Sequence, residues 1–195
     1  MFDKKGKFDM KITLLGDSIR MIGYGTKVPE LLGDDFEVFQ PADNCRFSKY
    51  TLRVIANYRK DMEGSRIVHW NNGLWDICNC TGDGFFTPMD EYVANMTRIA
   101  DILLSRYEKV IFATTTPTNN HPEFMGNHNI ERYNALIVPI LEKKGIIIND
   151  LYPLLASDVD KYIRHDDFIH LTEAGIEVAS KQVAEVIRKV ASELK

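Results

Sequence analysis

The sequence lacks the features of a membrane-spanning protein and of a protein that binds nucleic acid through a basic surface. Its 195 residues contain no apolar run of about 18 residues, the length from which a transmembrane helix is inferred. Lys and Arg number 24 against 28 Asp and Glu, and the resulting net charge of -4 disfavours electrostatic binding to phosphate backbones. We therefore expect neither a membrane nor a nucleic-acid partner.

Cysteine is scarce as well. The three cysteines, Cys45, Cys78 and Cys80, do not make a disulfide framework, and their odd number fits a reducing compartment. Only Asn79 separates Cys78 from Cys80, a spacing too short for the usual zinc-binding pair, so we expect two small side chains in a loop. Residues 1–10 lack the apolar segment of a secretory signal, which predicts a cytoplasmic location unless a signal peptide has been removed.

Motifs for common cofactors are also missing. The sequence contains neither the Gly-x-Gly-x-x-Gly turn of dinucleotide-binding folds nor a phosphate loop with Gly-Lys-Ser/Thr. His69, His121 and His128 do not form the His-x-x-x-His pair of a helical metal site. We therefore expect no cofactor and no metal.

Apolar runs alternate with amphipathic stretches along the whole chain. Five runs are typical of strands: Lys11–Leu15, Phe36–Phe39, Arg66–Trp70, Lys109–Thr114 and Ile146–Asn149. Four stretches have helical spacing: Ser48–Lys60, Met89–Tyr107, Asn129–Lys144 and a last helix from a Thr172 N-cap to about Leu194. This alternation predicts an α/β fold with a mainly parallel five-stranded sheet covered by helices on both faces. We expect a flexible tail over residues 1–10 and one domain over residues 11–195.

A serine follows the first predicted strand at the edge where open α/β sheets place their sites. The strand ends in Gly16-Asp17-Ser18, and a serine there is a candidate nucleophile once a base removes its proton. Asp167 and His170, three residues apart near the C-terminus, supply an orienting carboxylate and an imidazole base. The alternative is a simple strand-to-helix turn in which Asp17 or Ser18 caps the next helix.

These motifs together resemble those of the SGNH (GDSL-type) hydrolases, esterases built on a flavodoxin-like three-layer α/β/α sandwich. The family's nucleophile motif matches Gly16-Asp17-Ser18, and its terminal Asp-x-x-His motif matches Asp167–His170. Further likeness at several later segments extends the similarity from Lys11 to about Val190. The resemblance implies that Ser18, Asp167 and His170 form a catalytic triad.

The family's oxyanion hole is only partly matched. The family uses the N–H group of the nucleophile, a glycine N–H after the second strand and an asparagine amide after the third. The resemblance thus implies a role for the Ser18 N–H group. Cys45 falls where the glycine would lie, and its backbone N–H group can serve because no particular side chain is needed.

The third oxyanion donor is left open between neighbouring residues. The family's Gly-x-Asn-Asp reads Gly73-Leu74-Trp75-Asp76 here, so a tryptophan takes the asparagine position. A subgroup with an Asn-x-Gly-Leu-x-Asp pattern makes Asn71 the first choice and Asn72 the second, with the Trp75 indole N–H as a further option. The alternative is that both asparagines only bind backbone groups of the turn.

Substrate contacts are expected close to these groups. We expect Asp17, Arg46 and Trp75 at the substrate, although Arg46 could instead form a surface ion pair. We interpret the sequence as that of a serine ester hydrolase that cleaves short acyl esters, with an O-acetylated carbohydrate as the first expected substrate. Its rivals are a thioesterase or lysophospholipase, an acyl transferase and a non-catalytic binding module on the same fold. The oligomeric state stays open.

Overall fold

The five predicted strands form one parallel sheet. The computed structural model describes residues 10–124 and 126–194, so the predicted tail lies outside the described residues except for Met10. The strands are β1 (Met10–Leu15), β2 (Phe36–Phe39), β3 (Ile67–Asn71), β4 (Lys109–Ala113) and β5 (Ile147–Asn149). They are ordered β2-β1-β3-β4-β5 and every neighbouring pair is parallel. This is the flavodoxin-like strand order, and the predicted fold class is confirmed.

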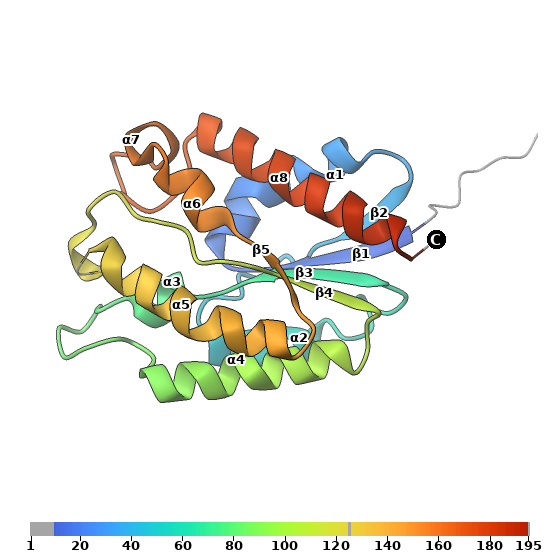
Figure 1. Cartoon of the computed structure of the whole chain (residues 1–195), viewed down its shortest axis with the longest axis horizontal. Helices are drawn as coiled ribbons and strands as arrows, with labels where there is room; N and C mark the ends of the chain where they lie inside the picture. The colour runs from blue at the N-terminus through green and yellow to red at the C-terminus, as the bar shows by residue number, and fades with distance from the viewer. Residues whose placement is uncertain (1–9, 125, 195) are drawn as a thin grey trace, which may run out of the picture.

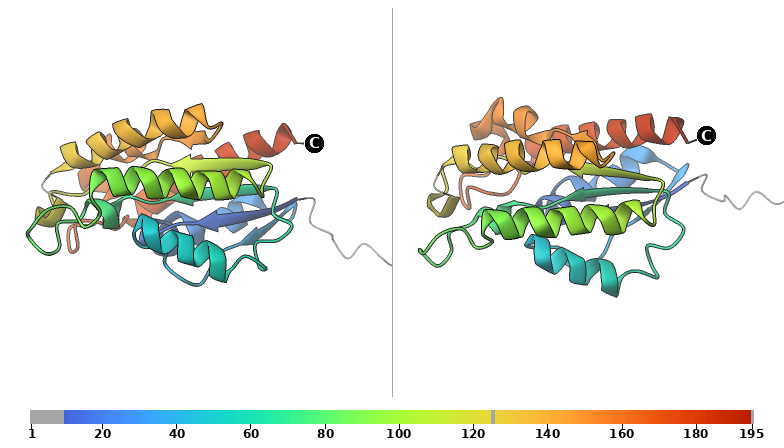
Figure 2. Two further views of the ribbon diagram at one scale, coloured as in Figure 1. Left: turned by 90° about the horizontal axis from the view of Figure 1, so that it is seen from below. Right: turned by 60° about the horizontal axis from the view of Figure 1, so that its bottom comes forward.

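Helices cover both faces of the sheet (Figures 1 and 2). One face carries α1 (Val28–Leu32) and α8 (Glu173–Ser192), and the other carries α2 (Ser48–Asn57), α4 (Met89–Leu104) and α5 (Asn127–Lys143). The long helices bury one apolar side each, as their spacing predicts. The Thr172 hydroxyl caps α8 by accepting the Gly175 N–H at 3.1 Å.

Several short segments have no counterpart among the predicted elements. They are the π-helical η1 (Ile19–Gly23), the 3-10 turns η2 (Tyr24–Thr26) and η3 (Pro122–Phe124), and the short helices α1, α3 (Leu74–Ile77), α6 (Leu151–Ala156) and α7 (Val159–Tyr162). Segments of three to six residues are too short to show a hydrophobic period. The expectation for the Cys78–Cys80 loop is also wrong, because the two sulfurs are joined in a disulfide across a single residue.

All strands end at the same edge of the sheet, on the left in Figure 1. The strand order reverses between β1 and β3, because β2 flanks β1 on one side and β3 flanks it on the other. Such a reversal leaves a crevice outside the carboxyl ends of the two central strands, where open α/β sheets bind ligands. Leu15 pairs with Trp70, so Gly16-Asp17-Ser18 lies beside Asn71-Asn72-Gly73.

Two glycines are required for this close approach. A Cβ atom at Gly16 would lie 1.9 Å from the Asn71 Oδ1 atom, so no larger residue fits between the two strand ends. Gly73 has a φ of 145°, and a Cβ there would lie 1.9 Å from the Thr115 Oγ1 atom. Gly16, two residues before Ser18, is therefore required for the packing of the β1 end against the β3 end.

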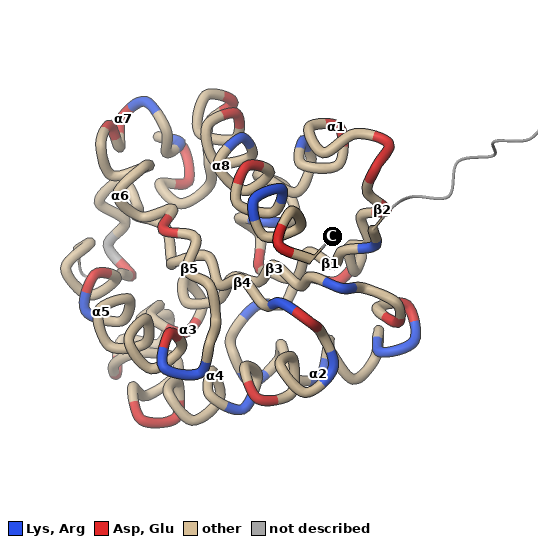
Figure 3. Tube along the Cα trace, turned by 45° about the vertical axis from the view of Figure 1, so that its right-hand side comes forward, with Lys and Arg blue, Asp and Glu red and all other residues tan. Residues whose placement is uncertain are grey.

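The outer surface carries charges of both signs. Figure 3 shows Lys and Arg interspersed with Asp and Glu over the outer helices and loops. Within residues 10–124 and 126–194, each helix is too short or too polar to traverse a lipid bilayer.

Asp76 of α3 joins three helices beneath the site. Its buried carboxylate accepts the Ser48 backbone N–H at 2.9 and 3.0 Å and the Ser48 hydroxyl at 2.7 Å, at the first residue of α2. Asn95 of α4 donates to the same Ser48 hydroxyl oxygen at 3.2 Å. Burial raises the pKa of Asp76 to about 6, against the lowering effect of the bonds from Ser48. The carboxylate thus supports α2 and the loop that precedes it.

This raised pKa predicts a pH-dependent contribution to stability. Because the folded-state pKa of about 6 exceeds the ordinary value of 3.8, the Asp76 carboxylate binds a proton more tightly in the folded protein than in the unfolded chain. Acidification from pH 7 to pH 4 should therefore raise the free energy of unfolding of the wild type relative to Asp76→Asn by about 2–3 kcal/mol. Urea denaturation at several pH values measures this difference. The exposed Asp90→Asn variant should follow the wild type, and a difference for Asp76→Asn that does not change with pH would contradict the assignment.

Candidate active site

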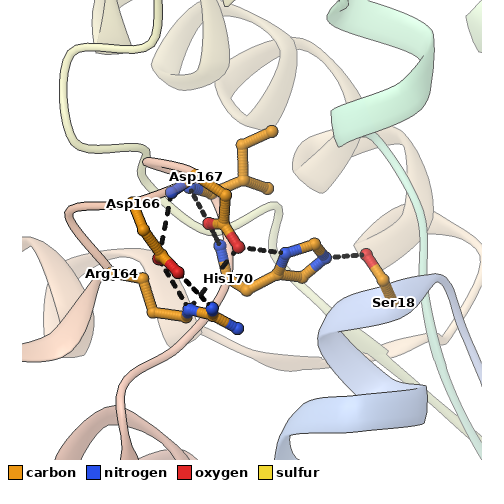
Figure 4. Close-up of polar contacts among 6 residues, drawn as sticks. Ser18, Arg164, Asp166, Asp167 and His170 are labelled. Carbon is orange, nitrogen blue, oxygen red and sulfur yellow. Dashed lines mark hydrogen bonds and ion pairs between the residues drawn. The ribbon is translucent and has the colours of Figure 1, made fainter.

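Ser18, His170 and Asp167 form a continuous hydrogen-bonded line (Figure 4). The Ser18 Oγ atom lies 2.8 Å from His170 Nε2, and His170 Nδ1 lies 2.9 Å from Asp167 Oδ2. An ionised carboxylate only accepts hydrogen bonds, so Nδ1 carries the ring proton and Nε2 accepts the Ser18 hydroxyl proton. The structure therefore brings together the three residues predicted as a triad, in the order in which a triad works.

The Asp167 carboxylate is fixed by backbone donors. Its Oδ1 atom accepts the N–H groups of Ile169 and His170, each at 2.9 Å. Partial burial raises the pKa of Asp167, but the two N–H groups and the His170 ring outweigh it and hold the pKa at about 2. The carboxylate is therefore ionised at neutral pH, which fixes the His170 tautomer and stabilises an imidazolium.

The turn that carries these two residues is held from both sides. Phe168, between them, has a φ of 62°, and its carbonyl accepts the Asn119 N–H at 2.8 Å. The His170 carbonyl accepts the Arg164 N–H at 2.8 Å. Asp166, the neighbouring carboxylate, is occupied by an ion pair with the Arg164 guanidinium, as Figure 4 shows. The geometry thus selects Asp167 as the partner of the imidazole.

Asp17 lies inside the protein, away from the substrate. Its side chain is 1% exposed, and its Oδ1 atom accepts the Ile19 N–H at 2.9 Å and the Asn71 Nδ2 amide at 2.8 Å. Burial raises the pKa of Asp17, while the Asn71 amide and the Ile19 N–H lower it. The structure does not bring Asp17 to the substrate side of Ser18, and its hydrogen bonds fix the turn from which Ser18 projects.

The two asparagines after β3 are both buried and engaged in internal hydrogen bonds. Besides binding Asp17, Asn71 accepts the Tyr24 hydroxyl at 2.8 Å. The Asn72 Nδ2 amide donates to the Arg46 carbonyl at 2.8 Å, and its Oδ1 atom accepts bonds from Trp70 Nε1 and Thr51 Oγ1. Neither asparagine lines the cavity beside Ser18, so the structure does not place either amide at the expected oxyanion position.

The remaining expected contacts divide between interior and surface. The Cys45 N–H, expected as an oxyanion donor, instead donates to the Gly16 carbonyl at 3.1 Å, and Cys45 does not line the cavity beside Ser18. Burial raises the pKa of the Cys45 thiol to about 11. Arg46 is exposed, with its guanidinium carbon 4.9 Å from the centre of the Tyr50 ring. Trp75 alone among the expected substrate contacts lines the cavity, with 42% of its surface exposed.

A cavity of about 520 Å³ opens beside Ser18 and His170. Its remaining lining residues are mainly apolar: Met21, Ile22, Leu74, Trp75, Cys78, Cys80, Phe124 and Ile169, with Asn44 and Glu123 as the polar members. Sequence reasoning missed Asn44, although it lies in a polar loop after β2 and so at the same edge. It also missed Phe124 and Glu123, which come from the long loop after β4.

The described residues contain one cluster of metal-binding atom types. The sulfurs of Cys78 and Cys80 and a carboxylate oxygen of Glu123 lie within 4.8 Å of one another. Both sulfurs are joined in the disulfide, so neither is available as a thiolate ligand. This cluster therefore forms a covalently braced part of the cavity wall.

No family model and no curated protein matches the sequence. Solved structures do match. The acetyl xylan esterase AlAXEase has a TM-score of 0.74 at 18% identity, over 91% of this chain and 100% of its own. A lipase/acylhydrolase from Enterococcus faecalis has a TM-score of 0.74 at 20% identity, over 92% and 96%. A catalytic mutant of an acetylxylan esterase from Geobacillus stearothermophilus has a TM-score of 0.73 at 15% identity, over 93% and 95%. The chain therefore has the α/β fold that these ester-cleaving enzymes share.

Proposed function

We propose that this protein is a serine ester hydrolase of the SGNH (GDSL) type. The observation that carries the proposal is the Ser18–His170–Asp167 line, which ends in a hydroxyl at the wall of an open cavity. A serine becomes a useful nucleophile only when a correctly oriented base accepts its proton, and the hydrogen bonds from Ser18 to His170 and from His170 to Asp167 support this role. The fold shared with esterases and acylhydrolases supports the same chemistry.

The geometry supports a two-step acyl transfer to water. His170 Nε2 takes the Ser18 proton while Oγ attacks the ester carbonyl carbon, and the carbonyl electrons move to oxygen. When the carbonyl re-forms, the bond to the alcohol oxygen breaks and the imidazolium returns its proton to that oxygen. A water molecule, deprotonated by His170, then attacks the acyl-enzyme and releases the acid. Asp167 stays ionised and stabilises the imidazolium in both steps.

A short acyl ester of a carbohydrate is the first candidate substrate. Trp75 is half-exposed at the cavity and offers a flat apolar face for a sugar ring, while Glu123 offers a carboxylate for hydroxyl groups. Two of the structural neighbours are named acetyl xylan esterases, which agrees with this choice.

A longer acyl ester is the second candidate, favoured by the cavity itself. Its volume of about 520 Å³ and its apolar wall of Met21, Ile22, Leu74, Phe124 and Ile169 suit a hydrocarbon chain. The acyl chain of such an ester would fill the cavity, whereas an acetylated carbohydrate would place its sugar, the alcohol part of the ester, in the same space.

Ser18→Ala should abolish ester hydrolysis. We expect the rate of nitrophenol release from p-nitrophenyl acetate to fall by at least about 10³-fold, because the variant retains the cavity but has no nucleophile. Ser105→Ala, at an exposed serine that follows α4, is the matched control and should keep wild-type activity. Equal rates for wild type and Ser18→Ala would contradict a Ser18 mechanism. A wild type without turnover would favour a non-catalytic binding module.

The two candidate substrates predict different results, the first for the Trp75→Ala variant and the second for the acyl-chain preference of the wild type. If a sugar ring packs on the indole, the variant should raise KM for an acetylated xylo-oligosaccharide several-fold and leave p-nitrophenyl acetate unaffected. If the cavity holds an acyl chain, kcat/KM for p-nitrophenyl esters should rise from acetyl to octanoyl by up to about fourfold per CH₂ group. A series of acetyl, butyryl, hexanoyl and octanoyl esters measures the second effect. Acetyl as the best acyl group would contradict the acyl-chain mode.

A further inference from the structure

Ser18 is accompanied in its cavity by an amide that the predicted site does not contain. Asn44 lies in the loop between β2 and α2 and lines the same cavity as Ser18 and His170. Apart from the Trp75 indole, which has a single N–H, Asn44 is the neutral side chain of that wall with N–H groups that can stabilise negative charge, whereas the carboxylate of Glu123 would repel it. This placement matters because acyl transfer needs a donor aimed at the developing oxyanion.

The Asn44 side chain is anchored through one end only. Its Oδ1 atom accepts the Arg46 backbone N–H at 2.8 Å, which closes an Asx turn and fixes the orientation of the amide plane. Across the described part of the chain, no protein group accepts a hydrogen bond from the Asn44 Nδ2 atom. Two N–H donors of a residue that lines the same cavity as Ser18 are therefore without a protein acceptor.

The backbone around Asn44 is tied to the turn that carries Ser18. The Arg20 guanidinium is 2% exposed and donates to the carbonyls of Asp43 and Gly16, at 2.8 and 3.1 Å. The Cys45 N–H donates to the same Gly16 carbonyl at 3.1 Å. Both chain neighbours of Asn44 are thus linked by hydrogen bonds to Gly16, two residues before the nucleophile.

Asn72 completes this support from the third strand. Its Nδ2 amide donates to the Arg46 carbonyl at 2.8 Å, and Arg46 itself has a left-handed φ of 49°. The asparagine after β3 therefore holds the loop after β2, and the amide that faces the cavity comes from that loop. Preorganised donors of this kind cost no rearrangement during the reaction.

We propose that the Asn44 side-chain amide is an oxyanion donor, acting with the backbone N–H of Ser18, and that Asn72 is a positioning residue behind it. The inference rests on the proposed serine mechanism. It assigns to a side chain after β2 the role that the sequence motif led us to expect after β3. The substrate group recognised is the ester carbonyl oxygen as it becomes an anion.

Paired substitutions at Asn44 separate a catalytic role from a role in the turn. Asn44→Asp keeps the oxygen that accepts the Arg46 N–H but replaces the donor with a carboxylate, and Asn44→Ala removes both without adding charge. We expect kcat for p-nitrophenyl acetate to fall by about 10²–10³-fold in both variants, with KM changed by less than about threefold. Asn57→Asp, at an exposed position at the end of α2, controls for added charge and should behave as wild type.

The outcomes are distinct for this inference and for the proposed function. Full activity in Asn44→Asp, with or without loss in Asn44→Ala, would overturn the oxyanion role, because the turn alone would then suffice. Thermal unfolding of Asn44→Asp should match the wild type, so that a kcat loss is read as lost chemistry. If hydrolysis by the wild type survives Ser18→Ala, the serine mechanism itself fails, whatever the Asn44 variants do.

Discussion

The hydrogen bond between Asp17 and Asn71 joins the ends of the two central strands, and the site depends on it. The contact is buried, spans 2.8 Å and requires Gly16, since any side chain there would collide with Asn71. Because a buried carboxylate without a partner is costly, this bond commits the turn after β1 to one conformation. Ser18 then lies at the cavity, whereas its chain neighbours Asp17 and Ile19 are buried in the protein.

A chain of buried polar groups extends this contact across the sheet. The Tyr24 hydroxyl donates to Asn71 and lies 3.5 Å from the ring of His69, which in turn lies 3.1 Å from the Asn149 amide of β5. Burial lowers the pKa of His69 to about 3, so this histidine is neutral and serves as a structural link. The turn of the nucleophile is thus coupled to the ends of β3 and β5.

The base reaches the serine from a separate part of the fold. Its loop lies between α7 and α8, and Leu171, next to His170, forms an isolated β-bridge with Ile163. Gly175, in the first turn of α8, approaches so closely that a Cβ atom there would lie 2.2 Å from the Tyr162 carbonyl oxygen. This packing holds the loop so that His170 lies within hydrogen-bonding distance of Ser18, 152 residues earlier in the sequence.

The sequence predicted the five strands and the three residues Ser18, His170 and Asp167, because strands and short catalytic motifs each leave a local pattern in the sequence. Strands appear as short apolar runs, and the spacing of Asp167 and His170 reflects a single tight turn. The oxyanion donors were harder to place, because the motif identifies Asn71 and Asn72 but not the atoms to which they bind. Which amide faces Ser18 depends on how the loops after β2 and β3 pack together, and that contact is not encoded in either segment alone. The apolar cavity also arises from tertiary packing.

Covalent trapping tests the central claim most directly. A fluorophosphonate ester forms a stable adduct with a serine only when a neighbouring base activates its hydroxyl group. Mass spectrometry of the treated and digested protein should show one adduct, on the peptide that contains Ser18, and none after Ser18→Ala. An adduct on a different residue, or continued ester hydrolysis after complete labelling of Ser18, would contradict the account.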